Sequence, residues 1–399
     1  TLFIPMSYAF YLDSLLNLPA MGIPVINYSP ESTWEFGAAA QGYFRLPNQA
    51  RTSIVQLDGT YSLKDQWYIN AQGSLYFGRK NHTIPPYTTT TQPYTTLHNP
   101  TQPYTTLHHT TPHSWQLQFR AGYSDRPATY YGTYHDSYFA NEGNKGIGML
   151  RKGTSYQLQR GYLNIQTPIY VGKHMAVGPM ADLLIARFSI HDTYTTVNPL
   201  MQVALGAVAQ YDSRDNVFYP NSGIFAKLSA AAAWTNKIDI PQGQQATING
   251  LLAADIRQYI PLPHKLVLAW QLKTQLMLSK YEISHLTLYP MLPRLGGQDG
   301  LRGINSDMFR DDIMMAFQAE LRIPIWSIFR GTVFAGVGDV YDYHNWHWAV
   351  PKVSYGVGLR AAINRAKVNI RFDIARSNVD PRWDNISAYS FYLTATEAF

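Results

Sequence analysis

The 399-residue chain contains no cysteine and few charged residues, and these two shortages exclude several classes of protein. Without cysteine there can be no disulfide, no catalytic thiol and no thiolate metal site. Charged residues make up 15% of the chain, well below the roughly 25% of ordinary soluble domains. The net charge of +6 is small for this length and scattered, so nucleic acid is not expected as a partner.

Long hydrophobic runs are also missing, because no stretch reaches the roughly 18 apolar residues that a membrane-spanning helix needs. The mean hydropathy is −0.21. Aromatic residues are nevertheless abundant, at 14% of the chain with 29 tyrosines. This combination is typical of a β-barrel in a membrane, in which apolar residues facing lipid alternate with polar residues facing the lumen. The alternative is a soluble, tyrosine-rich β-sandwich or propeller.

Alternation of polar and apolar residues is the main secondary-structure signal. From Gln66 to Phe77, residues such as Trp67 and Ile69 alternate with polar or tyrosine residues, and Ser114 to Ser124 behaves in the same way. A period of two over ten or more residues predicts a strand. These lengths match the roughly 9–11 residues with which a tilted strand crosses a bilayer.

The same pattern predicts sixteen strands along the chain, an even number as expected for a closed antiparallel barrel. They lie near 22–29, 33–46, 51–63, 66–79, 113–124, 154–169, 174–191, 200–213, 222–235, 248–260, 264–279, 309–323, 329–341, 352–363, 366–376 and 387–399. Four long connections fall at one end, taken as the cell exterior: 125–153, 236–247, 280–308 and 342–351. We therefore predict an all-β, transmembrane antiparallel barrel of about 16 strands.

Two segments stand outside this pattern. We expect residues 1–20 to be a short periplasmic N-terminal segment before a barrel of residues 21–399, and any signal peptide to have been removed or to lie outside this sequence. Residues 80–112 form a low-complexity insertion on the periplasmic side, with "TQPYTTLHNP" followed by "TQPYTTLHHT". Proline, threonine and tyrosine with hardly any charge cannot build a core, so we expect an extended arm. Five histidines leave transient metal binding as an alternative: His82, His98, His108, His109 and His113.

Three motifs, spread over nearly the whole chain, resemble those of BamA/TamA-type outer-membrane barrels, also called the outer membrane protein 85 superfamily or bacterial surface antigens. "GLRGINSDMF" (Gly300–Phe309), followed by "AFQAELRIPI" and "GTVFAGVGDVYD", is similar to the C-terminal part of that family. "YSPESTWEFGAAAQGYF" (Tyr28–Phe44) is similar to its first hairpin. "YDSRDNVFYPNSG" resembles its turn between strands 8 and 9, with the motif residues Asp212, Arg214, Asp215, Pro220 and Gly223.

The resemblance also assigns a role to the last strand. This strand places Tyr389, Phe391, Leu393 and Phe399 on one side. Its terminal aromatic residue resembles the signal by which outer-membrane barrels are handed to the assembly machinery. A seam between the first and last strands is expected, with Ile26 facing Phe391 or a neighbouring residue of the last strand.

In the family, the loop that corresponds to 280–308 folds back into the lumen, and its arginine pairs with the inner wall. Here this arginine would be Arg302, between Leu301 and Gly303. Closing a loop of this length costs roughly 3 kcal/mol, so something inside must hold it. We therefore predict that Arg302 anchors a lumen-plugging loop; binding of a phosphate or carboxylate ligand and an exposed loop are the alternatives.

The partner of Arg302 departs from the family pattern. An aspartate usually stands on strand 13, but the matching position here is Gly336, and Asp339 has the opposite parity. On strand 12, Ala316, Gln318, Glu320 and Arg322 share the inward side. Glu320 is the expected partner, with Asp373 on strand 15 as second choice.

The resemblance implies a role in outer-membrane protein assembly or translocation, in which the seam opens and pairs with an incoming strand. Members with this activity typically carry periplasmic repeats before the barrel, and the start of this sequence leaves no room for them. We therefore expect a member without these repeats. Periplasmic or lipoprotein partner subunits would then supply the missing module. The alternative is a plugged structural or partner-anchoring barrel, as a homo-oligomer or complex subunit, and a pore is a third possibility that the loop disfavours. In each case the protein is integral to the bacterial (Gram-negative) outer membrane, surrounded by lipids and lipopolysaccharide.

Motifs of catalysis are not found, since the sequence contains neither "GxSxG" nor "HExxH" nor a recognisable pair of carboxylates. In "YHNWHW", His344 and His347 lie three residues apart, but a metal site needs further ligands. The tryptophans of this segment suit an aromatic girdle at the membrane interface. We therefore expect no enzyme activity, no cofactor and no bound metal.

Overall fold

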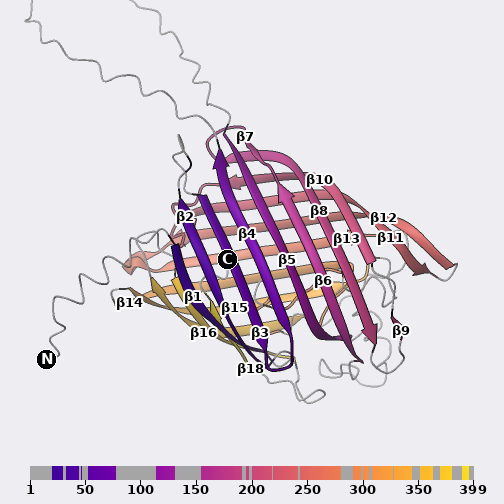
Figure 1. The fold of residues 1–399 in the computed structure, drawn as a ribbon. Helices are drawn as coiled ribbons and strands as arrows, with labels where there is room; N and C mark the ends of the chain where they lie inside the picture. The colour runs from indigo at the N-terminus through magenta and orange to yellow at the C-terminus, as the bar shows by residue number, and fades with distance from the viewer. Residues whose placement is uncertain are drawn as a thin grey trace, which may run out of the picture.

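The chain forms one antiparallel sheet that closes into a barrel, shown from the side in Figure 1. The structure is a computed structural model. It describes residues 20–29, 33–44, 46, 53–77, 114–130, 154–190, 195–196, 200–217, 219–240, 243–279, 291–297, 300–304, 308–326, 328–343, 351–362, 369–379 and 389–394. No helix within these ranges is long and apolar enough to cross a membrane.

The strands follow the alternating segments of the sequence. They are β1 (Ala20–Ser29), β2 (Thr33–Phe44), β3 (Ser53–Ser62), β4 (Trp67–Phe77), β5 (Trp115–Tyr130), β6 (Thr154–Gln166), β7 (Ile169–Tyr170), β8 (Met175–Ile190), β9 (Thr195–Thr196), β10 (Leu200–Asp212), β11 (Gly223–Ile240), β12 (Gly243–Pro261), β13 (Val267–Leu278), β14 (Ile313–Trp326), β15 (Phe329–Tyr341), β16 (Lys352–Ala362), β17 (Asn369–Ser377) and β18 (Tyr389–Thr394). A single 3-10 turn, η1 (Pro263–Lys265), joins β12 to β13.

Sixteen of these eighteen strands build the barrel wall, since β7 and β9 have only two residues each. Each wall strand is antiparallel to its neighbours, and β1 pairs with both β2 and β18, which closes the sheet. Every one of the sixteen predicted strands is present, although β5 continues to Tyr130, six residues into the loop predicted at 125–153. The predicted fold class is therefore confirmed.

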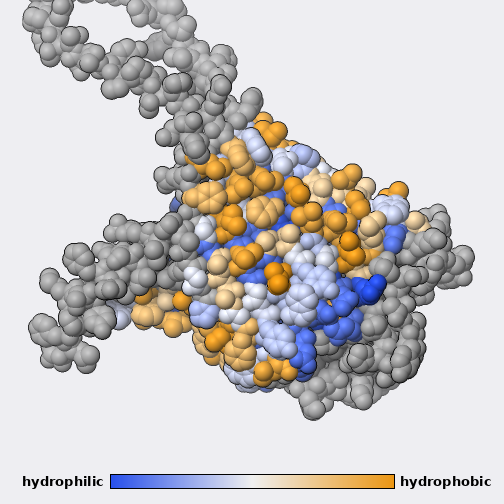
Figure 2. Space-filling view, in the orientation of Figure 1, coloured by the Kyte–Doolittle hydropathy of each residue, from blue (hydrophilic) through white to orange (hydrophobic). Residues whose placement is uncertain are grey.

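The period of two separates an apolar outer surface from a polar inner one. On β4, Trp67 and Ile69 are exposed, whereas Asn70 is buried. Figure 2 shows apolar side chains spread over the outer face of the wall, and exposed leucine, isoleucine or valine residues occur on most of the wall strands. An apolar surface of this extent is stable in contact with hydrocarbon rather than water.

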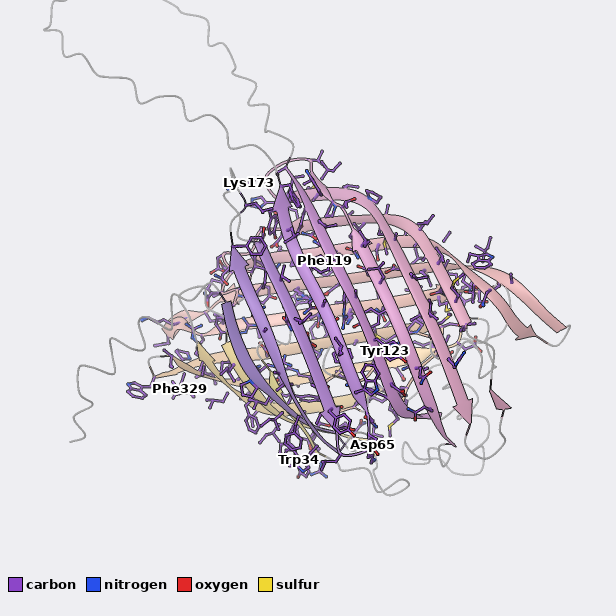
Figure 3. The ribbon with its side chains drawn as sticks, viewed as in Figure 1. Trp34, Asp65, Phe119, Tyr123, Lys173 and Phe329 are labelled. Carbon is purple, nitrogen blue, oxygen red and sulfur yellow. The ribbon has the colours of Figure 1, made fainter. Side chains whose placement is uncertain are left out.

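Aromatic side chains mark two levels on this outer surface. The rings of Trp67 and Tyr123 lie 4.8 Å apart at one end of β4, where Figure 3 also shows Trp34. At its other end, the rings of Phe77 and Trp115 are stacked at 4.2 Å. Trp67 and Phe77 are about 33 Å apart along the strand, or about 25 Å along the barrel axis at a tilt of about 40°. This is the height of the apolar band in outer-membrane barrels.

One predicted loop is wrong. Residues 236–247 were expected to be an exterior loop, but β11 continues to Ile240 and β12 begins at Gly243. After a register shift between Thr235 and Ile238, the two strands keep pairing up to Ile240 and Gly243. Adjacent strands can satisfy each other's backbone groups without a core beneath them, so polar composition alone did not end the pairing.

Several expectations lie outside the described residues. These are the N-terminal segment 1–19, the insertion 80–112 with its histidines, the segment 344–350 with its histidines and tryptophans, and Phe399. The antiparallel order places the connections after β5, β13 and β15 at one end of the barrel and the connection after β4 at the other.

Candidate functional site

The described part of the loop between β13 and β14 packs against the inward-facing side of the barrel wall. Leu295 and Leu301 lie with Met314 of β14 and Val340 of β15 in one buried apolar cluster. The loop also bonds to itself, since the backbone N–H of Leu301 donates to the carbonyl of Leu295 at 2.7 Å. These contacts hold the loop segment on the inner face; that the whole loop closes the lumen stays a prediction.

Arg302 is fully buried, and all three of its guanidinium nitrogens have acceptors. Nη2 donates to Glu320 Oε2 at 3.2 Å, Nη1 to Asp373 Oδ2 at 3.0 Å, and Nε to Gln318 Oε1 at 3.4 Å. The guanidinium carbon lies 3.7 Å from the ring centroid of Phe334. The structure thus places Arg302 between the two carboxylates named from the sequence, rather than beside one of them.

Three further arginines surround the same two carboxylates. Arg322 Nε lies 2.7 Å from Glu320 Oε1, Arg360 Nη1 lies 2.5 Å from Asp373 Oδ1, and Arg371 Nε lies 3.5 Å from Asp373 Oδ2. All of these side chains are at most 1% exposed. We call Arg302, these three arginines and the two carboxylates the arginine cluster. Among its six side chains, positive charges exceed negative charges by two, so each carboxylate is shared.

Glycines on β15 and β16 leave space for this cluster. A Cβ atom on Gly358 would overlap Asp373 Oδ1 and would lie 2.5 Å from Arg360 Nη1. A Cβ atom on Gly336 would lie 2.5 Å from Leu301 Cδ1. An aspartate at Gly336, as the family usually has, would therefore compete with Leu301 for its place.

Asp339 stands outside the arginine cluster. It forms an ion pair with Lys352 instead of Arg302, and both side chains are buried. Lys352 Nζ also lies 4.8 Å from the ring centroid of Phe309, just before β14. Asp339 therefore does not replace the aspartate that Gly336 lacks.

Gly303 connects the loop to the last strand. Its φ of +91° favours glycine, and a Cβ atom there would lie 3.1 Å from the Cβ of Ala375. Its N–H donates to the hydroxyl of Tyr392 at 3.2 Å. Because Tyr392 is paired with Asn27 of β1, the loop reaches the strand that closes the barrel.

The second motif forms the turn between β10 and β11. Arg214 donates to both carboxylate oxygens of Asp212, at 2.9 and 2.8 Å, and Asp215 Oδ1 accepts the N–H of Asn221 at 2.8 Å. Burial acts to lower the pKa of Arg214, but the hydrogen bonds with Asp212 outweigh it, so the pKa is raised. Gly223 ends the turn with a φ of +104°. The remaining motif residue, Pro220, uses its carbonyl to accept Arg322 Nη1 at 2.8 Å.

The closing seam has few residue pairs in the part of the chain that the structure describes. Ten residue pairs join β1 to β2, but only Ile26, Asn27 and Tyr28 pair with β18 in the described strands. Phe391 does not face Ile26: Leu393 faces Ile26, and Phe391 faces Tyr28. The difference is two residues, which keeps the side chains on the same face but moves the contact along the strand. Tyr389 is 45% exposed.

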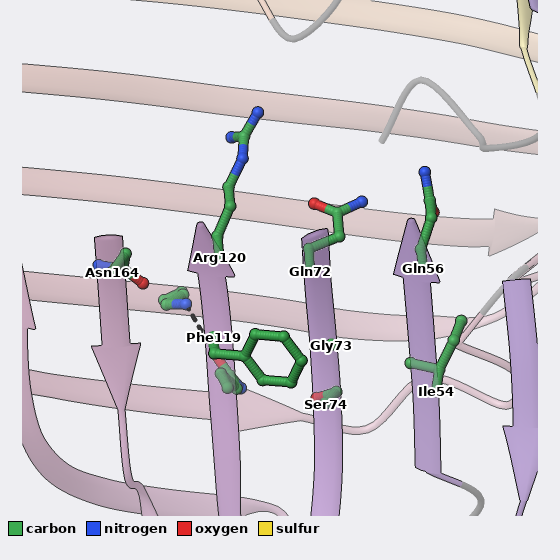
Figure 4. Close-up of a pocket in the computed structure, with 10 residues that line it drawn as sticks. Ile54, Gln56, Gln72, Gly73, Ser74, Phe119, Arg120 and Asn164 are labelled. Atoms are coloured by element: carbon green, nitrogen blue, oxygen red, sulfur yellow. Dashed lines mark hydrogen bonds between the residues drawn. The ribbon is translucent and has the colours of Figure 1, made fainter. Parts of the chain in front are cut away.

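A polar cavity of about 330 Å³ lies on the inner side of β3–β6 and β11. Its lining includes Gln56, Gln72, Gln118, Arg120 and Lys227. Figure 4 shows Gln56, Gln72 and Arg120 pointing the same way from adjacent strands, and Lys227 Nζ donates to Gln118 Oε1 at 2.9 Å. The described residues hold no group of three potential metal ligands.

The site also contains three residues that the sequence did not single out, Arg360, Arg371 and Tyr392, whereas Arg322 was placed on the inward side. The alternation of inward and outward side chains along a strand can assign each of these residues to the inner face. Their convergence depends on the register between β16, β17 and β18, which sets Gly358 opposite Asp373 and Asp373 opposite Tyr392. Register over separate strands is not visible in a single sequence.

Comparisons with known proteins agree with this architecture. The family model of the Omp85 superfamily domain matches residues 71–399. The fold is similar to BamA from Haemophilus ducreyi lacking POTRA domains 1–3, with a TM-score of 0.53, 15% identity, and coverage of 95% of this chain and 70% of that chain. No curated protein matches the chain.

Two CdiB structures are also similar in fold. The protein from Acinetobacter baumannii has a TM-score of 0.52 and 10% identity, over 94% of this chain and 59% of that one. The protein from Escherichia coli has a TM-score of 0.52 and 14% identity, over 95% of this chain and 63% of that one. This chain thus spans less than two thirds of either CdiB chain. At these identities the likeness to solved structures shows the fold alone. The family match, by contrast, covers most of the chain, including the Arg302 loop motif and the β10–β11 turn motif. The chain therefore belongs to the Omp85 superfamily.

Proposed function

We propose that this barrel assembles other proteins into the outer membrane or translocates them across it, and that the β1–β18 seam is where it acts. Membership of the Omp85 superfamily and the likeness to BamA and CdiB support an outer-membrane role of this kind. The observation that carries the proposal is the seam itself, with three residue pairs in the described strands against the ten between β1 and β2.

A strand edge with few partners is a site for another strand to add. Within the bilayer, unpaired backbone groups have no water to bond to, so a vacant edge is costly and favours pairing with an incoming strand. Pro24 lies in the part of β1 beyond the three described pairs and lacks an N–H for the ladder. The edge of β1 can therefore accept a partner more easily than an edge that already forms a complete ladder.

The proposed role needs no catalytic side chain, and we propose that the protein is not an enzyme and uses no cofactor. Substrate strands have to be delivered to the seam, so we also propose periplasmic or lipoprotein partner subunits. If instead the barrel is a structural anchor, the arginine cluster is its main feature and the seam has no separate task.

The test is to lock the seam with a disulfide. The protein has no native cysteine, so Ile26→Cys with Leu393→Cys introduces one facing pair at the seam. Val333→Cys with Val357→Cys is the matched control, because these residues face each other on the outer surface of β15 and β16. Each double variant replaces the wild-type protein in its native cell, and the folded barrel and the crosslink are checked on unheated gels.

The proposed function expects the locked seam to reduce the amounts of other outer-membrane or exported proteins, with recovery after a reductant is added. The control disulfide should leave these amounts unchanged. If the locked seam behaves like the control while crosslinking is complete, the seam mechanism is refuted, and the structural or partner-anchoring barrel is the better account.

A further inference from the structure

The turn between β10 and β11 enters the barrel from the end opposite the loop. Gly223, its last residue, is aligned through the successive cross-strand partners Tyr259 and Ala269 with Glu320. The loop instead joins β13 and β14 at the opposite end of the barrel, where β14 begins at Ile313, seven residues before Glu320. Segments from both ends of the barrel therefore meet at the level of Glu320.

The turn is fixed there by aromatic and carbonyl contacts with arginines. Tyr219 is 1% exposed and contacts Arg322 and Arg330, whose guanidinium carbons are 4.6 and 4.4 Å from its ring centroid. The carbonyl of Pro220 accepts Arg322 Nη1 at 2.8 Å. Arg322 thus contacts the turn at both the Tyr219 ring and the Pro220 carbonyl.

The same arginine is bonded to the carboxylate that holds the loop. Arg322 Nε donates to Glu320 Oε1 at 2.7 Å, and the other oxygen, Oε2, accepts Arg302 Nη2 at 3.2 Å. An unbroken chain of contacts therefore runs from Pro220 through Arg322 and Glu320 to Arg302. The side chains of Arg322, Glu320 and Arg302 are at most 1% exposed, so water does not screen the interactions between them.

We propose that Arg322 and Glu320 form a latch that couples the β10–β11 turn to the loop, so that releasing either segment loosens the other. Arg322 is a positioning residue in this latch. The inference goes beyond the proposed function, because it requires neither an open seam nor a client protein.

The coupling follows from the geometry of one shared carboxylate. With Arg302 in place, each oxygen of Glu320 has its own arginine, which fixes the plane of the carboxylate. Without Arg302, Oε2 turns toward Arg360 Nη2, now 3.7 Å away, and Oε1 turns with it. Arg322 then loses its alignment with Pro220, because hydrogen bonds weaken steeply with angle.

The test is hydrogen–deuterium exchange of the full chain in detergent micelles, read at the turn amides of Asp215, Asn221 and Ser222. Arg322→Ala should raise exchange there by about tenfold or more, equivalent to about 1.4 kcal/mol. Arg302→Ala should raise it by about threefold, although Arg302 lies in the other segment.

Arg257→Ala is the control. It removes an inner-wall arginine whose ion pair is with Asp255 and whose guanidinium carbon is 5.1 Å from the Phe225 ring, close to the turn. Exchange at the turn should stay within about twofold of wild type. Arg322→Lys distinguishes the positioning role of Arg322 from the effect of its positive charge. Lysine keeps the charge beside Glu320 but lacks the planar guanidinium group that bonds to two partners. It should loosen the turn while preserving the resistance of the barrel to denaturant.

The reverse direction gives a second measurement that does not depend on the arginine variants folding. Tyr219→Leu should raise exchange at the loop amides of Gly297 and Leu301, which are bonded to Ile304 and Leu295. If Arg302→Ala matches the control at the turn, or if Tyr219→Leu changes the turn alone, the two segments are independent and the latch is refuted.

Discussion

Replacing Glu320 with glutamine should destabilise the barrel more than replacing Arg302 with glutamine, although the two side chains form one ion pair. The reason is the excess of positive charge in the arginine cluster. Removing Arg302 reduces this excess, whereas removing the charge of Glu320 increases it. Buried charges without a counter-charge are among the most costly groups in a folded protein.

The magnitudes follow from what each change leaves behind. After Arg302→Gln, Glu320 keeps Arg322 at 2.7 Å and Asp373 keeps Arg360 at 2.5 Å. The cost should therefore lie near the lower end of the roughly 3–5 kcal/mol for breaking a buried pair. After Glu320→Gln, Asp373 is the one carboxylate that the arginine cluster keeps, so the cost should reach about 5 kcal/mol or more.

Equilibrium unfolding in guanidinium chloride, followed by the fluorescence of the nine tryptophans and by mobility on unheated gels, measures both costs. In the double variant, the two costs should fail to add by about 0.5–3 kcal/mol, because the side chains are in contact. Equal costs, or a greater cost for Arg302→Gln, would refute the charge argument. Additive costs would show that Arg302 depends on Asp373 rather than on Glu320.

Two further changes test the space and the bonds around the cluster. Gly358→Ala should lower the yield of folded barrel on unheated gels, because its methyl group would overlap Asp373 Oδ1. Gly42→Ala is the control and should fold normally, since its Cβ would be 4.0 Å from the nearest atom. Equal yields of the two variants would contradict the prediction for Gly358. Tyr392→Phe removes the acceptor of the Gly303 N–H. It should reduce the free energy of unfolding by about 1 kcal/mol in the same denaturant assay. If the free energy of unfolding is unchanged, the loop does not depend on β18.

The wall of the barrel could be predicted from the sequence because its signal is local. Long alternation, as on β4 from Trp67 to Phe77, identifies a strand without reference to any other segment. The end of β11 was missed for the opposite reason. Asn236, Lys237 and Pro241 suggest a loop, and only pairing with β12 makes the segment up to Ile240 a strand.

The candidate site was only partly predictable. Family resemblance indicated Arg302, and parity on β14 indicated Glu320, whereas Arg360 and Arg371 join the cluster through registers that no single strand encodes. Gly336 could be recognised as a departure, but its reason could not. That reason is the buried side chain of Leu301, which comes from a loop with no periodic signal.

The arginine cluster and the seam are adjacent, and this constrains how the barrel could open. The loop contacts described above lie on β14, β15, β17 and β18, and the last of them joins Gly303 to Tyr392. Among the described residues, β17 and β18 are paired over six residues, but β18 and β1 over three. The loop therefore stiffens the β18 side of the seam and adds nothing described to the β1 side. If the seam opens, β1 and its hairpin partner β2 are the strands that move, while β18 stays with the cluster as the fixed edge.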